Sequence, residues 1–484
     1  MKYIAAAAVL ALSACTVGPD YLGVTAPQPV VYKELAGWKP ASPRDAIDKG
    51  AWWSAFRDPV LDRLERQVRI SNQNVAAAEA AYRQAIALVG ETQAGLFPTL
   101  GITPAVTRQS LNGAASSSRV GVSGGNKAIS NYSLEGSASW APDVWGRIRR
   151  QVESQQATAQ VSAADLANAT LSAQATLATD YFDLRAEDSL IRLLTDTVGQ
   201  YRHALEITQN EYDAGTASRA DVVTADAQLK TTQALLVGVG VQSAQFEHAI
   251  AVLTGHAPAE LTIPPGLLAT EVPVVPAGLP SALLERRPDI AAAERTVAAQ
   301  NAEIGVAIAA YYPDISLSAA FGFAGNPLSS LFTVANRVWS LGASASETLL
   351  DGGLRTATVA AARAGYDEDV AAYRQTVLSA FQQVEDELAA LRILEQQAVA
   401  EDAAVAAAQR AVDVTLNEYR AGTVAYTSVI TEQTQLLSDQ QTALSVQQNR
   451  LVAAVALIEA LGGGWRAGDL PGKVPFDPMA VIRP

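Results

Sequence analysis

Apolar side chains recur at intervals of three and four residues through two long proline-free stretches of the chain, about 147–212 and 353–419. The clearer pattern is in the second stretch, where the recurring positions are Tyr366, Val370, Tyr373, Val377, Phe381, Val384, Leu388 and Leu391. This spacing puts the apolar side chains on one face of an α-helix and is typical of coiled-coil packing. At 1.5 Å per residue, each stretch predicts a helix about 100 Å long.

Each long stretch is followed by a second helical pattern, at 219–253 and 426–461. Gly215 and Gly422 stand between the two patterns, where a glycine fits the left-handed residue that ends a helix. The chain is therefore predicted to contain two antiparallel helical hairpins, with their tips at these glycines.

Four shorter segments alternate apolar residues with small or polar ones: about 98–110, 131–144, 313–323 and 337–349. In the first, Leu100, Ile102 and Val106 lie on one face. A period of two predicts β-strands, and strands of about ten residues with one apolar face are typical of membrane β-barrels. The alternative is a soluble sandwich with its apolar face inward, which is weaker because each half of the chain supplies only one hairpin.

Four strands cannot close a barrel, and hydrocarbon does not tolerate an open sheet edge. Chains must therefore combine. Two chains would give about eight strands, whose interior is filled by side chains, whereas three would give about twelve and leave a water-filled bore.

The two halves of the chain repeat each other. Residues 210–229 and 417–436 share 10 of 20 positions at an offset of 207. Further upstream the offset is 215, with Gly90 matching Gly305 and Phe97-Pro98 matching Tyr312-Pro313. Such a repeat indicates one structural unit built twice.

The N-terminus reads as a targeting signal. Lys2 is followed by an apolar run that is too short to span a bilayer and then by Leu12-Ser13-Ala14-Cys15. This ending resembles a bacterial lipobox, which implies cleavage before Cys15 and acylation of its thiol; the alternative is an ordinary signal peptide with an incidental cysteine. Thr16 follows, rather than an aspartate, which implies sorting to the outer membrane. We expect no transmembrane helix after Cys15, so any crossing would be made by strands.

Composition excludes several functions. The net charge is -14 with Lys and Arg widely spread, so nothing indicates a nucleic acid partner. Cys15 is the only cysteine, and the three histidines share no spacing, so neither disulfides nor a metal site are predicted. No catalytic or phosphate-binding motif is present, and we expect neither enzymatic activity nor a cofactor.

These patterns divide the chain into six segments. They are a signal peptide (1–14), an extended lipidated segment (15–56), a first repeat (57–256), a proline-rich connector (257–286), a second repeat (287–464) and a C-terminal tail (465–484).

Five motifs in this order resemble the TolC-like outer membrane efflux proteins, in particular their NodT-type lipoprotein branch. They are Gly-Pro-Asp-Tyr at 18–21, Trp-Trp-Ser-Ala-Phe-Arg-Asp-Pro at 52–59, Trp-Ala-Pro-Asp-Val-Trp-Gly-Arg at 140–147, Leu-Pro-Ser-Ala-Leu-Leu-Glu-Arg-Arg-Pro-Asp-Ile at 279–290 and Ala-Leu-Gly-Gly-Gly-Trp at 460–465.

The resemblance implies a mostly α-helical protein with a membrane β-barrel. Its homotrimer would form a twelve-stranded barrel in the outer membrane of a Gram-negative bacterium, continued by an α-helical tunnel in the periplasm. It also implies a diacylglycerol and an N-acyl group on Cys15, and coupling through a periplasmic adaptor, a membrane fusion protein, to an inner-membrane pump.

Two residues match the family's periplasmic gate: Asp221, six residues after Gly215, and Tyr419, three before Gly422. Their alternatives are a helix N-terminal residue for Asp221 and plain interhelical packing for Tyr419. The gate aspartates of the family are replaced by Ser428 and Thr431, which leaves its ion selectivity open. The resemblance also assigns adaptor contact to the tips, Ala214, Gly215, Thr216, Ala421, Gly422 and Thr423.

The function predicted is a passive, gated duct that exports drugs or other small molecules from an inner-membrane pump. A dedicated protein exporter would use the same bore. A purely structural periplasmic spacer or adhesin is the alternative of another class, but it would not need the four alternating strands.

Overall fold

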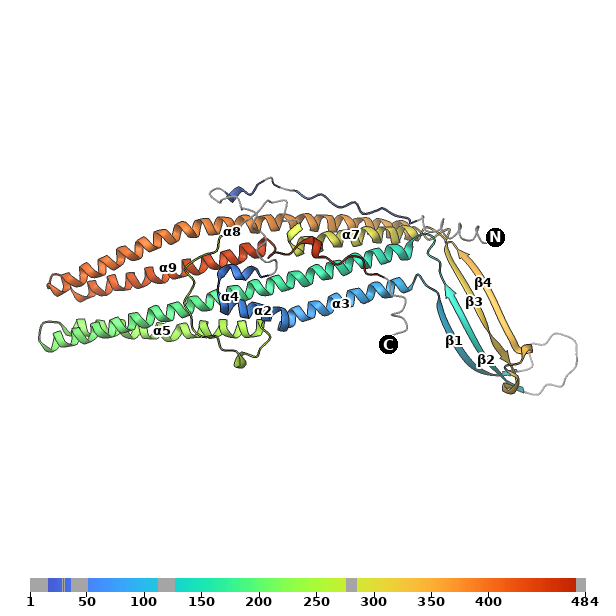
Figure 1. Cartoon of the computed structure of the whole chain (residues 1–484), viewed down its shortest axis with the longest axis horizontal. Coiled ribbons are helices and arrows are strands. Elements are labelled where there is room, and N and C mark those ends of the chain that lie inside the picture. Colours follow the sequence, from blue (N-terminus) through green and yellow to red (C-terminus); the bar gives the residue numbers. More distant parts are fainter. Residues whose placement is uncertain are drawn as a thin grey trace.

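The structure, a computed structural model, describes residues 16–27, 29, 31–35, 51–111, 127–275 and 285–475. The predicted signal peptide and Cys15 lie outside these residues. The molecule is a long rod of helices with a small sheet at one end, as Figure 1 shows. The mostly helical fold with a small sheet that the sequence predicts is confirmed.

The chain order follows the repeat. The helices are α2 (Pro59–Ser71), α3 (Gln73–Ala94), α4 (Arg147–Asp213), α5 (Arg219–Leu253), α7 (Pro288–Ala309), α8 (Leu354–Arg420) and α9 (Tyr426–Ala460). The strands are β1 (Thr99–Leu111), β2 (Lys127–Trp140), β3 (Asp314–Gly325) and β4 (Arg337–Ser346). Short 3₁₀ turns lie at Lys33–Leu35, Trp52–Phe56, Pro258–Glu260, Leu328–Ser330, Val334–Asn336 and Ala467–Asp469. The succession helix, strand, strand, long helix, shorter helix thus occurs twice.

The two long helices, α4 and α8, have 67 residues each, and the two returning helices, α5 and α9, have 35 each. Gly215 and Gly422 end the long helices with positive φ angles of 78° and 74°. In both turns the next residue returns its N–H to the last helical turn, from Thr216 to Glu211 and from Thr423 to Glu418. This is the glycine-terminated helix end that the sequence predicts.

One of these helices, α5, is long and apolar enough to span a membrane. By length and composition alone α5 could cross a membrane, the single such helix among the described residues, although none was expected after Cys15. The run of Ala, Leu, Val and Gly from Ala234 to Val241 makes α5 apolar. In the structure α5 lies along α4 as one arm of a hairpin (Figure 1).

The four strands form one antiparallel sheet in the order β1-β2-β3-β4. Its register aligns the apolar residues of all four strands: Leu100 lies opposite Ala138, Ala138 opposite Ala319, and Ala319 opposite Leu341. Among the described residues, β1 and β4 are paired on one side only. The sheet therefore has one apolar face and two open edges.

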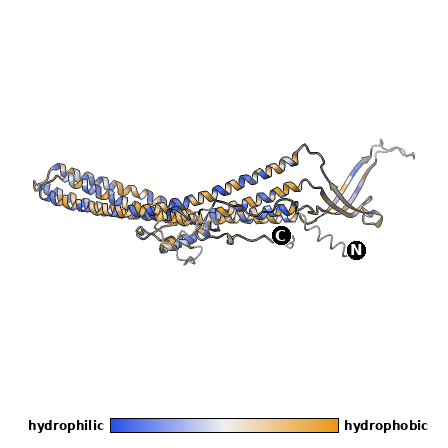
Figure 2. Cartoon of the chain, turned by 90° about the horizontal axis from the view of Figure 1, so that it is seen from above, coloured by the Kyte–Doolittle hydropathy of each residue, from blue (hydrophilic) through white to orange (hydrophobic). Residues whose placement is uncertain are grey.

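The hydrophobic core lies in the middle of the rod, where α2, α4, α5, α7, α8 and α9 meet. Its large, fully buried side chains include Leu61, Leu64, Leu177, Tyr181, Phe182, Ile250, Ile290, Leu388, Leu451 and Leu457. Elsewhere along the helices apolar and polar residues are interspersed, as Figure 2 shows. The connector crosses this region, with Pro264 O accepting from Arg185 of α4 and Ala269 O from Gln447 of α9.

Candidate functional site

The two hairpin tips lie together at the end of the rod opposite the sheet (Figure 1). The predicted contact residues at both tips, Ala214, Gly215, Thr216, Ala421, Gly422 and Thr423, are all exposed. Below them, Tyr426 and Val429 of α9 are buried with Ala225 of α5, and Leu205, Leu416 and Tyr419 pack against this cluster. The tips of the two repeats are thus held to each other by a small apolar core.

Tyr419 makes the polar link between the two tips. Its hydroxyl donates to Glu211 Oε2 at 2.9 Å, and its ring lies 5.2 Å from the Tyr426 ring. Burial first, and then the bond to Glu211, raises the pKa of the Tyr419 hydroxyl, which therefore stays protonated and donates. A hydrogen bond to a carboxylate is about twice as strong as a neutral one, yet it can be broken reversibly.

Asp221, the other predicted gate residue, lies nearby but is not brought into hydrogen bonding with Tyr419. Its Oδ2 accepts from the backbone N–H of Ser218 at 2.9 Å and from the Ser218 hydroxyl at 2.7 Å. Ser218 Oγ in turn accepts from the Asp221 N–H, which completes a capping box at the start of α5. The carboxylate still contributes to raising the pKa of Tyr419 through its charge.

Sequence reasoning missed Glu211. A glutamate on the last turn of a long helix is most simply a solvated residue, and nothing in its own surroundings distinguishes it. The signal was in the repeat, because Asn210-Glu211-Tyr212 recurs as Asn417-Glu418-Tyr419.

At the opposite end of the rod, the sheet exposes its apolar face. Leu100 is 81% exposed, Ile102 77% and Leu341 76%. Aromatic side chains lie at the junction with the helices, where Trp145 stacks on Tyr312 with ring centroids 4.9 Å apart and donates to Pro313 O. An apolar sheet face ending in aromatic residues matches the surface of a membrane-embedded barrel.

An N-terminal strap, residues 16–27 and 31–35, runs from this junction along α7 and α8 (Figure 1). Arg150 of α4, which is buried, donates to Val17 O and Gly18 O and pairs with Asp20. Gly18 lies directly on Gly305 of α7, so that a Cβ at Gly18 would come within 2.4 Å of the Gly305 Cα. This contact explains the Gly-Pro-Asp-Tyr motif, while Cys15 lies outside the described residues.

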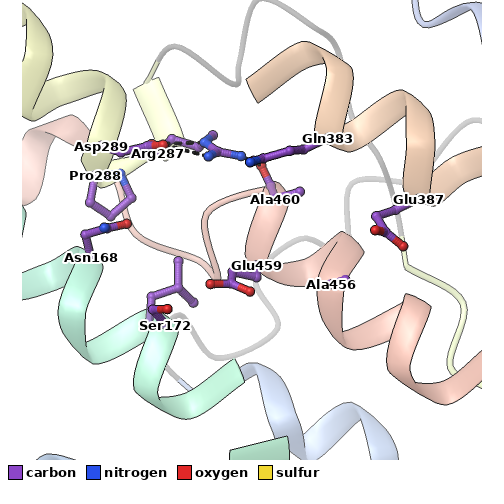
Figure 3. A pocket seen from close by; sticks show the side chains of 11 residues that line it. Asn168, Ser172, Arg287, Pro288, Asp289, Gln383, Glu387, Ala456, Glu459 and Ala460 are labelled. Carbon is purple, nitrogen blue, oxygen red and sulfur yellow. Dashed lines mark hydrogen bonds and ion pairs between the residues drawn. The ribbon is translucent and has the colours of Figure 1, made fainter. Parts of the chain in front are cut away.

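A polar hollow of about 360 Å³ lies where the two repeats meet in the middle of the rod (Figure 3). Arg287 spans it, donating to Asp289 and to Ala460 O at the end of α9. Glu459 faces the same space, and burial raises its pKa. The Arg-Arg-Pro-Asp motif thus joins the start of α7 to the end of α9. The described residues contain no group of three or more potential metal ligands.

A long helical rod with paired tips and an amphipathic sheet defines the class of outer-membrane channels. The sequence profile of the family described as outer membrane efflux protein matches residues 64–256 and 279–463. The chain belongs to this family.

Individual relatives support the same family assignment. The antibiotic efflux pump outer membrane protein ArpC of Pseudomonas putida is 31% identical over 471 residues, covering 94% of this chain and 93% of ArpC. The pyoverdine export outer membrane protein OpmQ of Pseudomonas aeruginosa is 31% identical over 464 residues, covering 95% and 96%. The solved outer-membrane channel OprN is 29% identical with a TM-score of 0.84, covering 95% of this chain and all of that one. The predictions of an efflux protein located in the outer membrane are confirmed.

Proposed function

We propose that the chain forms a homotrimeric, passive duct that exports drugs or other small molecules. Its twelve-stranded barrel would cross the outer membrane, and its helices would continue the bore through the periplasm. The observation that carries the proposal is the single apolar face of a four-stranded sheet whose two edges are open. In lipid each edge needs a partner strand, and β4 of one chain can supply it to β1 of the next.

The tips would close the periplasmic end. The Tyr419–Glu211 bond holds the two hairpins of one chain together, and Asp221 fixes the start of α5 beside it. Opening requires the hairpins to separate, which breaks this bond and leaves the helices themselves intact. The gate residues Tyr419 and Asp221 thus act together with Glu211.

The exposed tips at Ala214–Thr216 and Ala421–Thr423 would contact a periplasmic adaptor, which links the duct to an inner-membrane pump. Acylated Cys15 would add a lipid anchor at the sheet end of the molecule. We keep the six-segment division of the chain, from a signal peptide at 1–14 to a tail at 465–484, as part of this proposal.

The proposal is tested by conductance and crosslinking. The purified protein is expected to insert into planar lipid bilayers and to give discrete channels. A photo-crosslinking residue in place of Thr216 or Thr423, both exposed, is expected to capture the adaptor in cells, while one at exposed Leu22 on the strap should not. A protein that extracts without detergent after Cys15→Ser and gives no conductance would instead be a periplasmic spacer.

A further inference from the structure

The apolar face of the sheet carries charge at one end only. Residues directly opposite each other in the register share a face, so the face that includes Leu100 can be followed through all four strands. On this face, Arg108 of β1 and Arg337 of β4 are the only charged residues of the described strands. The two acidic residues of the strands, Glu135 and Asp314, lie on the opposite face. The apolar face therefore holds two positive charges and no negative one.

Both arginines lie at the end of the sheet that is remote from the helices. The helices join the sheet at the start of β1 and at the end of β4 (Figure 1). Arg108 is nine residues beyond Thr99, the first residue of β1, and Arg337 is itself the first residue of β4. In the proposed duct, this remote end of the sheet faces the cell exterior.

The spacing along β1 matches the depth of a membrane. At about 3.4 Å per residue, Arg108 lies about 30 Å along the strand from Thr99. A strand tilt of about 40° reduces this length to about 23 Å of depth, close to the roughly 25 Å apolar band of membrane barrels. Arg108 therefore reaches the outer boundary between lipid and water, where headgroups lie.

Aromatic residues accompany the arginines on the same face. Phe323 lies directly opposite Arg337, and Trp339, two residues further along β4, is 68% exposed. Tyr132 of β2 lies diagonally across from Arg108 in the register. Together with the aromatic residues at the helix junction, these side chains give the sheet an aromatic belt at each end, as membrane barrels have at both interfaces.

Neither arginine is neutralised within one chain. Both are exposed, and neither takes part in a salt bridge among the described residues. They lie on the two edge strands, three strand spacings or about 14 Å apart across the sheet. In the proposed homotrimer, β4 of one chain lies beside β1 of the next, which puts Arg337 and the Arg108 of the next chain on adjacent strands. The pair is therefore complete only at the seam between two chains.

We propose that each seam binds the phosphorylated headgroup of a lipid in the outer leaflet, with Arg337 of one chain and Arg108 of the next contacting its phosphates. This inference rests on the homotrimer proposed above. Guanidinium groups bind phosphate oxygens in bidentate pairs, and basic side chains at a membrane surface attract anionic headgroups. The acyl chains of the same lipid lie against the apolar face, so charge and apolar surface recognise one molecule.

Native mass spectrometry of the detergent-solubilised particle measures this binding. The probes are lipid A, whose sugar headgroup carries phosphates, and the same lipid after enzymatic removal of its phosphates. Each arginine near a membrane surface contributes about a factor of five, so removal of the phosphates is expected to weaken binding about 25-fold. Wild-type protein should bind one lipid A per chain with this preference. Equal binding of the two lipids would overturn the inference, and this comparison needs no variant.

Substitutions assign the preference to the two arginines. Arg108→Gln and Arg337→Gln are each expected to weaken binding of lipid A about fivefold, and the double variant about 25-fold, with binding of the dephosphorylated lipid unchanged. The matched control is Arg219→Gln, which removes the same charge from an exposed position at the start of α5. The control is expected to bind lipid A as the wild type does. An equal loss in the control and in the sheet variants would contradict a site at the seam.

Inorganic phosphate distinguishes a lipid site from a site for a free anion. Phosphate that binds the wild type but not the double variant, without any preference for lipid A over its dephosphorylated form, would overturn the inference in favour of a free anion. The mass of the wild-type particle separates this result from failure of the proposed function. A particle that is not a trimer removes both proposals, whereas a trimer without a preference for phosphorylated lipid removes only this one.

Discussion

Two carboxylates lie near the Tyr419 hydroxyl, and the local backbone decides which of them accepts its hydrogen bond. Asp221 is the third residue of α5, where its carboxylate is taken up by Ser218. Glu211 lies on the last turn of α4 and reaches across to the other hairpin. Asp221 therefore stabilises the start of α5, whereas Glu211 joins the two repeats.

This division gives different results for two conservative substitutions. Glu211→Gln replaces a charge-assisted hydrogen bond by a weaker neutral one. It should destabilise the closed state relative to the open state by about 1 kcal/mol. Asp221→Asn keeps a side-chain oxygen that can accept from Ser218, the N-cap residue of α5. It should therefore leave the open probability of the channel nearly unchanged. Single-channel recording compares their open probabilities, and a larger effect of Asp221→Asn than of Glu211→Gln would contradict the assignment.

Glu65 of α2 makes the stability of the fold depend on pH. It is fully buried, and neither of its carboxylate oxygens has a hydrogen-bond partner among the described residues. Burial, and then the charge of Asp62, raises its pKa to about 9. The native state thus holds a proton that the unfolded state releases near its ordinary pKa, so stability is full below that pKa and is lost as pH rises toward 9, by about 1.4 kcal/mol per pH unit.

Glu65→Gln imitates the protonated form. It is expected to raise the unfolding temperature at pH 8 and to leave it nearly unchanged at pH 4. Thermal denaturation of the detergent-solubilised protein at both pH values measures this. An equal shift at both pH values would mean that Glu65 is not protonated in the native state.

At the scale of elements, the strap depends on close contact between backbones. A Cβ at Gly305 would come within 2.8 Å of the Arg150 side chain, whereas one at Gly90, the equivalent position of the first repeat, would meet nothing within 4 Å. Both repeats have a glycine at this position, but only Gly305 lies so close to a neighbouring side chain that a Cβ would clash.

Gly305→Ala is therefore expected to release the strap, at a cost of about 1–3 kcal/mol for overpacking. Gly90→Ala should be neutral or stabilise α3 by up to about 1 kcal/mol. The measurement is the rate of maleimide labelling of Val17→Cys, a half-buried strap position, in each background. Equal rates in the two backgrounds would show that the strap does not depend on this contact.

The elements were largely predictable because they follow from local patterns. Leu100, Ile102 and Val106 mark a strand by alternation alone, and Gly215 and Gly422 mark helix ends by backbone conformation alone. The contacts of the strap and of Glu211 were not predictable: the repeat marks Glu211 as a position but does not give its partner, because Arg150 meets Asp20 across 130 residues and Glu211 meets Tyr419 across 208. A single sequence gives no measure of such distant contacts.

At the scale of the whole molecule, the account requires that the apolar sheet face meets lipid. Ile102 lies on that face and Thr103 on the other, and both are exposed in one chain. Ile102→Lys should cost about 2–4 kcal/mol at mid-membrane depth and reduce the amount of assembled protein in the outer membrane, while Thr103→Lys should be tolerated. Quantitative blotting of outer-membrane fractions compares the two, and equal yields would place the apolar face in water.

The central claim is that one chain has too few strands to enclose a pore and that three chains share one wall. Native mass spectrometry of the particle released gently in detergent tests this most directly. The account predicts a particle with the mass of three lipidated chains and no stable smaller species. A stable particle with the mass of one or two chains would contradict it.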